Sequence, residues 1–420
     1  MQRDFEHIGI RPPQVLLPVA EVDMKKWAVV ACDQFTSQMQ YWQDVQHCVG
    51  DAPSTLRMII PEAYLNRPDV DEMQREAACK MEEYLQAGLL HEAGCAFIFV
   101  ERSVGESKRY GLMAELDLEA YDFRGKALVR PTEKTVLERL PPRMAVRQMA
   151  PIELPHVLVL FDDEHDQVFA AARSAINFEE PLYDFDLMSG GGHIRAWHVR
   201  ASGEAGIAQA FEELRVGSEM LFAVGDGNHS LATAKMCWEQ IKQTLAPEAW
   251  AGHPARYALV ELENLRDEGI VFHPIHRVIF GVNADEFIQT LAGYMQPVQS
   301  GGAKRFVRCV SQYGSTALYI PDEYPQSPVC MVQDALERTM QDFPQAYVDY
   351  VHGEDACIEL GAQADNVGIL LDAFDKEKLF STVLQRGVLP QKSFSMGEAW
   401  EKRYYIECRR IKAEVLKDGN

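Results

Sequence analysis

The chain has 420 residues, and its 63 acidic and 41 basic side chains give it a formal net charge of −22. With 47% hydrophobic and 25% charged residues it has the composition of a folded globular protein, which excludes disorder over most of its length. A strongly negative surface repels phosphate backbones, and no long block of Lys and Arg offsets it, so we expect no nucleic-acid partner. At roughly 100–200 residues per domain, the length predicts two or three domains.

The cysteines and the first residues indicate the cellular compartment. The nine cysteines are odd in number and contain neither a Cys-x-x-Cys pair nor a histidine at zinc-finger spacing, which favours reduced thiols. Asp4 and Glu6 stand where a secretory signal would be basic and then apolar, and no run of about 18 apolar residues occurs. We therefore expect a cytoplasmic protein with no membrane partner. Its oligomeric state does not follow from the sequence.

Strand-like and helix-like patterns alternate in the first third of the chain. Residues 27–32 predict a short buried strand, residues 73–88 a helix, and residues 95–100 a second strand with an antiparallel neighbour at 111–118. Asp33 directly follows the first strand, at a position where polar side chains often meet a ligand, and is either a metal carboxylate or a solvated surface residue. The pattern predicts a mixed α and β core.

Five prolines between residues 131 and 155 punctuate the next stretch. They bound an expected helix at 133–140 and an expected strand at 157–161. The glycine run 190–192 precedes a strand at 194–199, so we expect an ordinary turn there. A shift in composition at 281–286 predicts a boundary between regions 1–284 and 285–420, with elements expected at 303–310, 316–320 and 373–385 in the second.

The most informative segment is a strand, a tight turn and a helix at residues 220–242. The turn consists of Gly225, Asp226, Gly227, Asn228, His229 and Ser230. Such a turn points the first N–H groups of the helix outward, where the helix dipole adds positive potential, and its glycines let an anion approach the main chain. The segment therefore predicts a site for a phosphate or a carboxylate.

The same residues also permit a purely structural interpretation. Asn228 or Ser230 would cap the helix, the two glycines would permit the turn, and His229 would be a hydrogen-bonded surface histidine. The glycine spacing matches neither G-x-x-x-x-G-K-[ST] nor G-x-G-x-x-G, so neither a P-loop nor a dinucleotide site is indicated. Spacing alone does not choose between the two interpretations.

Four segments resemble, in the same order, the signatures of one bacterial and archaeal family. Residues 225–234 resemble its Asp-Gly-His-His-Arg-Tyr-x-x-Ala motif, and residues 130–135 resemble Arg-x-His-Glu-x-Thr. Residues 272–278 resemble Leu-Pro-Thr-His-Arg, and residues 388–393 resemble Met-Pro-x-Lys-Ser. Over nearly its whole length, the chain thus resembles a divergent member of the family known as domain of unknown function 1015.

The central motif is in turn similar to the phosphate-contacting turn of the ParB and sulfiredoxin superfamily, which includes free-serine kinases. The resemblance implies an α+β fold with a mixed-sheet, nucleotide-binding core and a smaller α+β carboxy-terminal region. Asp226, Gly227 and His229 match by identity, but Asn228 replaces a His and Ser230 an Arg. Because Ser cannot supply a bidentate phosphate clamp, either another cation compensates or the activity has drifted.

The matching segments supply the candidate site residues. Those expected to bind phosphates are Gly225, Gly227, Asn228, Ser230, Arg130, Lys134, Arg277 and Lys392. In a phosphotransfer scheme Asp226 would bind Mg²⁺, His229 would stabilise the moving phosphoryl group, and Glu133 would deprotonate the acceptor. Alternatively, Glu133 is a first-turn carboxylate stabilised by its helix dipole. His273 and His276 are three apart on an expected strand and face opposite sides, so we expect no zinc site there.

These residues favour a nucleotide-dependent phosphotransferase that uses ATP or ADP, with Mg²⁺, on a small hydroxylated metabolite such as serine. Two alternatives remain open. One is a non-catalytic sensor of a nucleotide or phosphorylated metabolite. The other is a phosphate-ester hydrolase in which water replaces the acceptor hydroxyl. All three imply a phosphorylated small-molecule ligand.

Overall fold

The computed structural model describes residues 5–36, 38–65, 67–295, 305–320 and 327–413. The chain divides into a first unit, Met1–Ile270 with Glu398–Asn420, and a second unit, Val271–Gly397. The boundary expected after residue 284 differs from this division. Strands β14 (Phe272–His273) and β15 (Ile275–Phe280) belong to the second unit because they pair only with its strands among the described residues.

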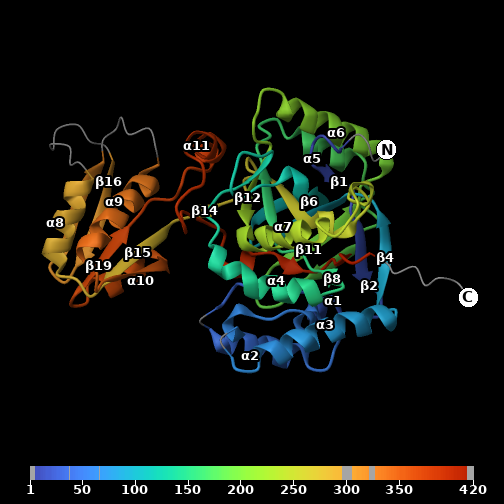
Figure 1. The fold of residues 1–420 in the computed structure, drawn as a ribbon, viewed down its shortest axis with the longest axis horizontal. Helices are drawn as coiled ribbons and strands as arrows, with labels where there is room; N and C mark the ends of the chain where they lie inside the picture. The colour runs from blue at the N-terminus through green and yellow to red at the C-terminus, as the bar shows by residue number, and fades with distance from the viewer. Residues whose placement is uncertain (1–4, 37, 66, 296–304, 321–326, 414–420) are drawn as a thin grey trace, which may run out of the picture. The chain divides into compact units, whose positions relative to one another are not determined.

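A nine-stranded mixed sheet forms the centre of the first unit (Figure 1). Its strand order is β10-β11-β5-β6-β13-β9-β12-β7, with β1 paired to β6. The β13–β9 and β12–β7 pairs are parallel and the remaining pairs antiparallel. This confirms the α+β class and the mixed sheet. The strands are β1 (Ile10–Arg11), β5 (Ile98–Val104), β6 (Ser107–Asp117), β7 (Val129–Pro131), β9 (Leu158–Phe161), β10 (Tyr183–Asp186), β11 (His193–His198), β12 (Phe222–Asp226) and β13 (Tyr257–Asn264).

Alternating side chains of this sheet feed two separate cores. Leu112 and Ala114 of β6 pack on the face covered by α5 (Gln167–Ser174), α6 (Ala201–Arg215) and α7 (Asn228–Lys242). Met113 points to the opposite face, where it meets α2 (Met39–Val49) and β21 (Tyr404–Tyr405). Because a strand turns successive side chains to opposite faces, a sheet covered on both sides needs apolar residues at nearly every position. The apolar runs in β5, β9 and β12 meet this need.

Some of the expected elements are confirmed, and others differ in extent or in type. The expected helix at 73–88 is α3 (Val70–Gln86), and the expected antiparallel pair is β5 with β6. The expected strand at 27–32 is only β3 (Val29–Val30), preceded by α1 (Met24–Trp27). The expected helix at 133–140 is instead a loop followed by η5 (Leu137–Arg139) and α4 (Leu140–Met149). Pro141 and Pro142 lie in the first turn of α4, where a missing N–H costs nothing.

The second unit is built on a five-stranded antiparallel sheet of order β17-β16-β19-β15-β18. Helices α8 and α9 share one core with it, and α10 shares another. The expected strand at 303–310 begins outside the described residues, and the expected helix at 373–385 is shorter than predicted. The elements are α8 (Ala284–Tyr294), β16 (Arg305–Ser311), β17 (Gly314–Ile320), α9 (Pro328–Asp342), β18 (Tyr347–His352), α10 (Glu354–Gly361), β19 (Asn366–Leu370), α11 (Leu379–Arg386) and β20 (Ser395–Met396).

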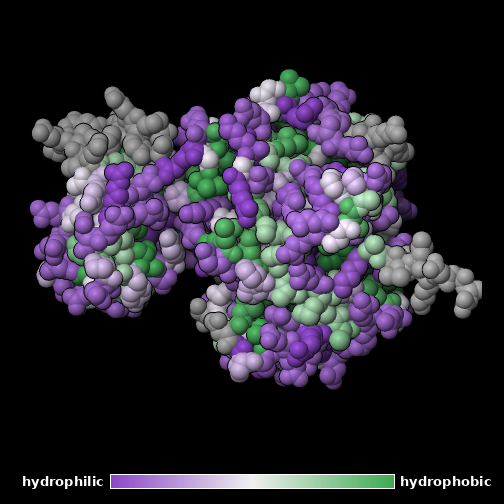
Figure 2. Space-filling model, viewed as in Figure 1, coloured by the Kyte–Doolittle hydropathy of each residue, from purple (hydrophilic) through white to green (hydrophobic). Residues whose placement is uncertain are grey.

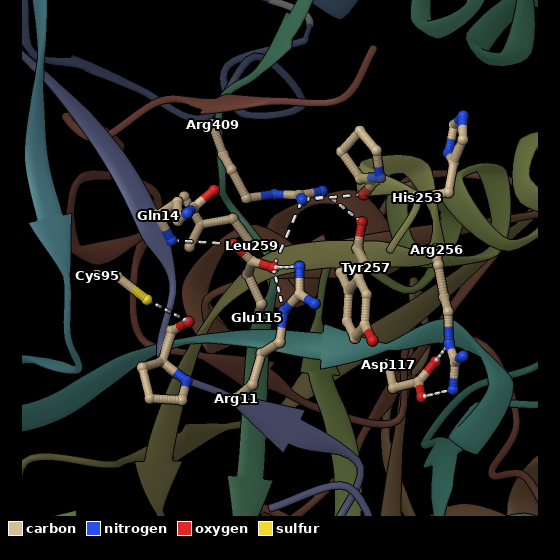
Figure 3. A network of polar contacts seen from close by, with 12 residues as sticks. Arg11, Gln14, Cys95, Glu115, Asp117, His253, Arg256, Tyr257, Leu259 and Arg409 are labelled. Carbon is tan, nitrogen blue, oxygen red and sulfur yellow. Dashed lines mark hydrogen bonds and ion pairs between the residues drawn. The ribbon is translucent and has the colours of Figure 1, made fainter. Parts of the chain in front are cut away.

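Residues 398–413, here called the C-terminal segment, are tied into the first unit by buried arginines. Arg409 donates from Nε to Glu153 at 2.7 Å, and its Nη1 lies 3.6 Å from Glu115. Arg11 meets the same Glu115 carboxylate at 2.6 Å, as Figure 3 shows. Strand β22 (Arg409–Arg410) also pairs with β8 (Ile152–Glu153). Two arginines and two carboxylates therefore fix one end of the segment.

Arg403 fixes the other end of the C-terminal segment. Its side chain is 2% exposed and pairs with Glu261 of β13 at 3.0 Å and with Glu407. The hydroxyl of Tyr183 donates to the other oxygen of Glu407 at 2.5 Å. Strand β21 pairs with β3, so Ala31 at the end of β3 lies beside this arginine and donates to its carbonyl at 2.9 Å. These contacts position the residues that flank Arg403.

Glu263 on β13 makes the stability of the first unit depend on pH. Burial raises the pKa of its carboxyl from 4.5 to about 8, and Glu261 and Asp267 add to the shift while Arg109 and Arg403 oppose it. The folded state then holds a proton that the unfolded state releases, so stability falls as the pH rises from about 4.5 to about 8. We expect this loss to be smaller in Glu263→Gln, by up to about 1.4 kcal/mol per pH unit.

Urea unfolding followed by tryptophan fluorescence checks this prediction, because all six tryptophans lie in the first unit. The wild type and Glu263→Gln should diverge steadily between pH 5 and pH 8. Parallel stability curves over that range would contradict the assignment of the buried proton to Glu263.

The surface agrees with the composition. Hydrophilic side chains cover most of the face drawn in Figure 2, and hydrophobic ones form separate small groups. Within the described ranges, every helix is too short or too polar to cross a bilayer.

Candidate functional site

Three segments of the first unit meet at one edge of the large sheet. Because β7 and β12 are parallel, the loop 132–136 after β7 and the turn 225–230 after β12 emerge at the same edge. Strand β9 runs antiparallel to β12, with Leu158 opposite Asp226, so His156 just before β9 lies there too. The structure thus brings together two of the segments that the sequence singled out.

The turn leaves the N-terminus of α7 without a side-chain cap. Gly227 is the N-cap residue and is left-handed, with φ 78°, and as a glycine it has no side chain that could accept from the first helical amides. The first turn closes from the Leu231 N–H to the Gly227 carbonyl at 3.0 Å. Among the described residues, no acceptor is found for the N–H groups of Asn228 and Ser230. The amide of Gly227, expected to be free, instead donates to Asp226 Oδ1 at 3.0 Å.

The capping interpretation of Asn228 and Ser230 is wrong. Asn228 donates from Nδ2 to the carbonyl of Val224 at 3.4 Å, and the same carbonyl accepts from Thr132 at 2.7 Å. The Ser230 hydroxyl bonds to His156. The Oδ1 atom of Asn228 is buried and has no hydrogen-bond donor within the described part of the chain. A ligand hydroxyl would satisfy this acceptor.

Lys402 of the C-terminal segment supplies a cation beside this turn. Its side chain is 8% exposed, and its ammonium lies 3.2 Å from Asp226 Oδ2. Asp33 is also close: burial acts to raise the pKa of its carboxyl, but His156, a hydrogen bond from Gln34 and Lys402 outweigh burial and lower it. Asp33 is therefore ionised at neutral pH. Lys402, which no sequence motif indicated, thus places a cation beside the turn.

A chain of hydrogen bonds runs from the turn into the core. Ser230 Oγ lies 2.7 Å from His156 Nε2, and His156 Nδ1 lies 3.1 Å from the hydroxyl of Tyr405. That hydroxyl donates to Cys32 Sγ at 3.1 Å and accepts from the Cys32 N–H at 3.1 Å. Burial, reinforced by Asp33, raises the pKa of the Cys32 thiol to about 12, and burial also raises that of Tyr405 well above its usual value. Both groups stay neutral.

His229 and the loop 132–136 occupy the same edge. His229 Nε2 accepts from the Val136 N–H at 3.2 Å, which places the proton of a neutral imidazole on Nδ1. Glu133 and Lys134 lie in this loop, Glu133 partly buried and Lys134 exposed. Gly225 lies at an irregularity in the β12 pairing with β9. The structure therefore keeps both proposed catalytic segments at one edge, with His229 engaged through Nε2.

Of the other expected phosphate-binding cations, Arg130 belongs to the first unit, and Arg277 and Lys392 belong to the second. Arg130 faces the start of β12, where it bonds to the carbonyls of Ala127 and Glu219. Arg277 is fully buried in the second unit and donates to the carbonyl of Gln391, next to Lys392. The family-like segments around Arg277 and Lys392 therefore meet each other within the second unit.

The donors at this edge do not form a resident metal site. Within the described residues, no group of three or more His, Cys, Asp and Glu side chains is arranged to hold a metal ion. Asp226, the expected Mg²⁺ ligand, has one oxygen paired with Lys402 and the other with the Gly227 amide. His273 and His276 lie on separate strands, and His276 Nδ1 accepts from the Leu371 N–H.

Sequence reasoning missed His156, Lys402 and Tyr405. They come from the start of β9 and from the C-terminal segment, and no spacing links them to the turn. The only signals were a histidine between Pro155 and an apolar strand, and basic residues interrupting an apolar stretch near the end of the chain. A hollow of about 610 Å³ lined by Glu119, Lys126 and Lys235 lies farther along α7 and does not include these residues.

Comparisons with known proteins agree with the resemblance seen in the sequence. The family model described as protein of unknown function (DUF1015) matches residues 15–343. No curated protein matches. A free serine kinase in complex with AMP is 12% identical, covers 72% of this chain and 92% of its own, and has a TM-score of 0.39.

Two further solved structures give similar values. A conserved hypothetical protein from Pyrococcus furiosus is 13% identical over 72% of this chain and 95% of its own, with a TM-score of 0.34. The C-terminally truncated SbnI from Staphylococcus aureus is 11% identical over 73% and 90%, with a TM-score of 0.36. At these values the likeness carries no argument about the site, which must be judged from its own residues.

Proposed function

The chain belongs to the family described as protein of unknown function (DUF1015), and we propose from its own site that it is a nucleotide-dependent phosphotransferase. The phosphates of ATP or ADP would bind at the N-terminus of α7, and the acceptor would be a small hydroxylated metabolite. The observation that carries this proposal is the largely buried ammonium of Lys402 beside an uncapped helix N-terminus.

The local chemistry favours an anion with several oxygens. The Lys402 ammonium has three N–H donors, and Asp226 is its one partner among the described residues, so donors remain for a ligand. The amides of Asn228 and Ser230 point out of the helix along its dipole. Phosphoryl transfer mainly requires that phosphates are held, their charge is neutralised and a hydroxyl is positioned. These groups supply the first two requirements.

Acceptor binding is proposed at the same edge. The unsatisfied Oδ1 of Asn228 would accept from the acceptor hydroxyl, and Glu133 in the neighbouring loop would take its proton. His229 would orient the phosphates through Nδ1, because its Nε2 is held by Val136. This engagement of His229 also favours the alternative of a non-catalytic sensor, in which binding shifts a conformational equilibrium without turnover.

Phosphorus NMR of the protein with ATP or ADP and a panel of hydroxylated acceptors, serine among them, tests the proposal. We expect a new phosphate-ester signal that requires the acceptor. We also expect a strong loss of rate in His229→Ala and in Asp226→Asn, because Asp226 positions the Lys402 ammonium and the Gly227 amide. Nucleotide binding without any product would favour the sensor, and release of inorganic phosphate without an acceptor would favour the hydrolase. Full rates in both variants would refute the assigned roles.

Gly227→Ala should impair both folding and nucleotide binding. A Cβ there would approach Val157 Cα to 3.0 Å, and the left-handed backbone would be strained by about 1–3 kcal/mol. Gly217 is a matched control, because it has the same φ of 78° with nothing within 4 Å of an added Cβ. The midpoint temperature of thermal unfolding should be lower in both variants than in the wild type. Isothermal titration with ADP should show weakened binding only in Gly227→Ala. Equal ADP affinities in the two variants would show that the turn is not part of the ligand site.

A further inference from the structure

We propose that Ser230 is a covalent phosphoryl acceptor, activated by His156 as its general base. The proposal rests on the proposed function for the identity of the donor, but its geometry is independent of that function. Ser230 would take the terminal phosphoryl group of the nucleotide and pass it to the small acceptor. In this chain a nucleophile would thus stand at the position where the family motif has an arginine.

The nucleophile and its base are already in contact. Ser230 Oγ lies 2.7 Å from His156 Nε2, within the reach that proton transfer requires. Ser230 is in the first turn of α7, where the positive end of the helix dipole stabilises an alkoxide and an incoming phosphate alike. Both side chains are only partly buried, so a ligand can reach them.

The second nitrogen of His156 is held by a buried group. Tyr405 is 2% exposed, its proton is directed to Cys32 Sγ, and its oxygen lies 3.1 Å from His156 Nδ1. In this arrangement Nδ1–H donates to the phenol oxygen, and Nε2 is left as the acceptor for the Ser230 proton. The ionised Asp33 stabilises the imidazolium that forms. Tyr405 is therefore a positioning residue, and Ser230 and His156 are the catalytic pair.

The phosphoryl group would be transferred in two steps. In the first, Ser230 Oγ attacks the terminal phosphorus, its proton moves to His156 Nε2, and the bond to the bridging oxygen breaks, so that the shortened nucleotide leaves with the electron pair. His156 keeps this proton while the shortened nucleotide departs. In the second, the acceptor hydroxyl gives its proton to Glu133 and attacks the phosphoserine, His156 returns its proton to the departing Ser230 oxygen, and Glu133 then releases its proton to solvent. No oxidant, reductant or further reactant is needed.

Two reagents test the nucleophile in the full-length protein. One is ATP or ADP carrying ³²P in its terminal phosphate, and the other is a fluorophosphonate ester, which supplies its own leaving group and needs no nucleotide site. We expect acid-stable label at Ser230, mapped by mass spectrometry, and none in Ser230→Ala. His156→Ala should be labelled at least about 100-fold more slowly, and added imidazole should restore part of the rate. Ser218→Ala, in which a similarly exposed serine bonded to Met220 is removed, should behave as the wild type.

The result separates this inference from the proposed function. Product formation by phosphorus NMR in Ser230→Ala at the wild-type rate would overturn the covalent step and leave the phosphotransferase intact. Failure of both reagents to label Ser230, or imidazole-independent labelling in His156→Ala, would also overturn it. If the wild type reacted with the fluorophosphonate but did not bind nucleotide, Ser230 would still be a nucleophile, but a nucleotide could not be its phosphoryl donor. Tyr405→Phe should slow the labelling of Ser230, because Tyr405 positions His156. In His156→Ala, by contrast, added imidazole should still restore part of the rate while Tyr405 is present.

Discussion

Replacing Lys402 by methionine is expected to weaken ADP binding by about 10- to 100-fold. A charged hydrogen bond contributes about 1.5–3 kcal/mol, and the variant also leaves the Asp226 carboxylate without its partner beside the incoming phosphates. Both effects act against an anion. Isothermal titration of the wild type and Lys402→Met with ADP measures the loss.

Three further variants show whether the charge itself is responsible. Lys402→Arg keeps the charge and should retain most of the affinity. Asp226→Asn with Lys402→Met removes both charges and should stay weak, because the lost donor is not replaced. Lys235→Met is a matched control. Lys235 lies on α7 but farther along the helix than the turn. Like Lys402 it is mostly buried, with a side chain 15% exposed, and it pairs with a carboxylate, Glu239, at 2.7 Å. Equal affinities in Lys402→Met and Lys235→Met would exclude Lys402 from the site.

Arg403→Met should cause the largest loss of stability. The variant leaves Glu261 and Glu407, whose side chains are 3% and 0% exposed, without their shared cation. Breaking a buried ion pair in this way costs about 3–5 kcal/mol, because an uncompensated charge remains in the core. Urea unfolding followed by tryptophan fluorescence measures the effect in the first unit, which contains all six tryptophans.

Lys412→Met is the control for Arg403→Met. Lys412 lies on the same C-terminal segment but is exposed, and it bonds only to the Met149 carbonyl among the described residues. Its replacement should change stability by less than about 0.5 kcal/mol. If Arg403→Met lost no more than this, the buried network would not be what holds the C-terminal segment, and with it Lys402, in place.

The sequence predicted correctly those helices and strands that are marked by apolar runs and by turn residues next to them. The strand, turn and helix at 220–242 and the antiparallel pair of β5 and β6 follow from apolar runs bounded by turn residues. The helix expected at 133–140 failed because Pro141 and Pro142 begin α4 instead of ending a helix before it. The boundary expected after residue 284 differs because β14 pairs with β20, and β15 pairs with β18 and β19, all of them distant strands of the second unit.

The sequence predicted only some of the residues that meet at the candidate site. The turn and the loop 132–136 are brought together by parallel pairing of β7 with β12, a pairing that no local pattern predicts. Lys402, Tyr405 and His156 reach the turn through the β21 pairing with β3 and the β9 pairing with β12. Such contacts depend on which strands are neighbours, and a single sequence with period-two patterns does not specify neighbours. Hence Lys402 was missed, and Arg130 was expected at the turn although it faces the start of β12.

A crystal structure of the protein with ADP would show whether nucleotide phosphates bind at the N-terminus of α7. We expect the terminal phosphate at the start of α7, with oxygens within about 3 Å of the amides of Asn228 and Ser230 and of the Lys402 ammonium. A nucleotide bound elsewhere, or an α7 whose first amides are satisfied by the protein itself while ADP is bound, would contradict it.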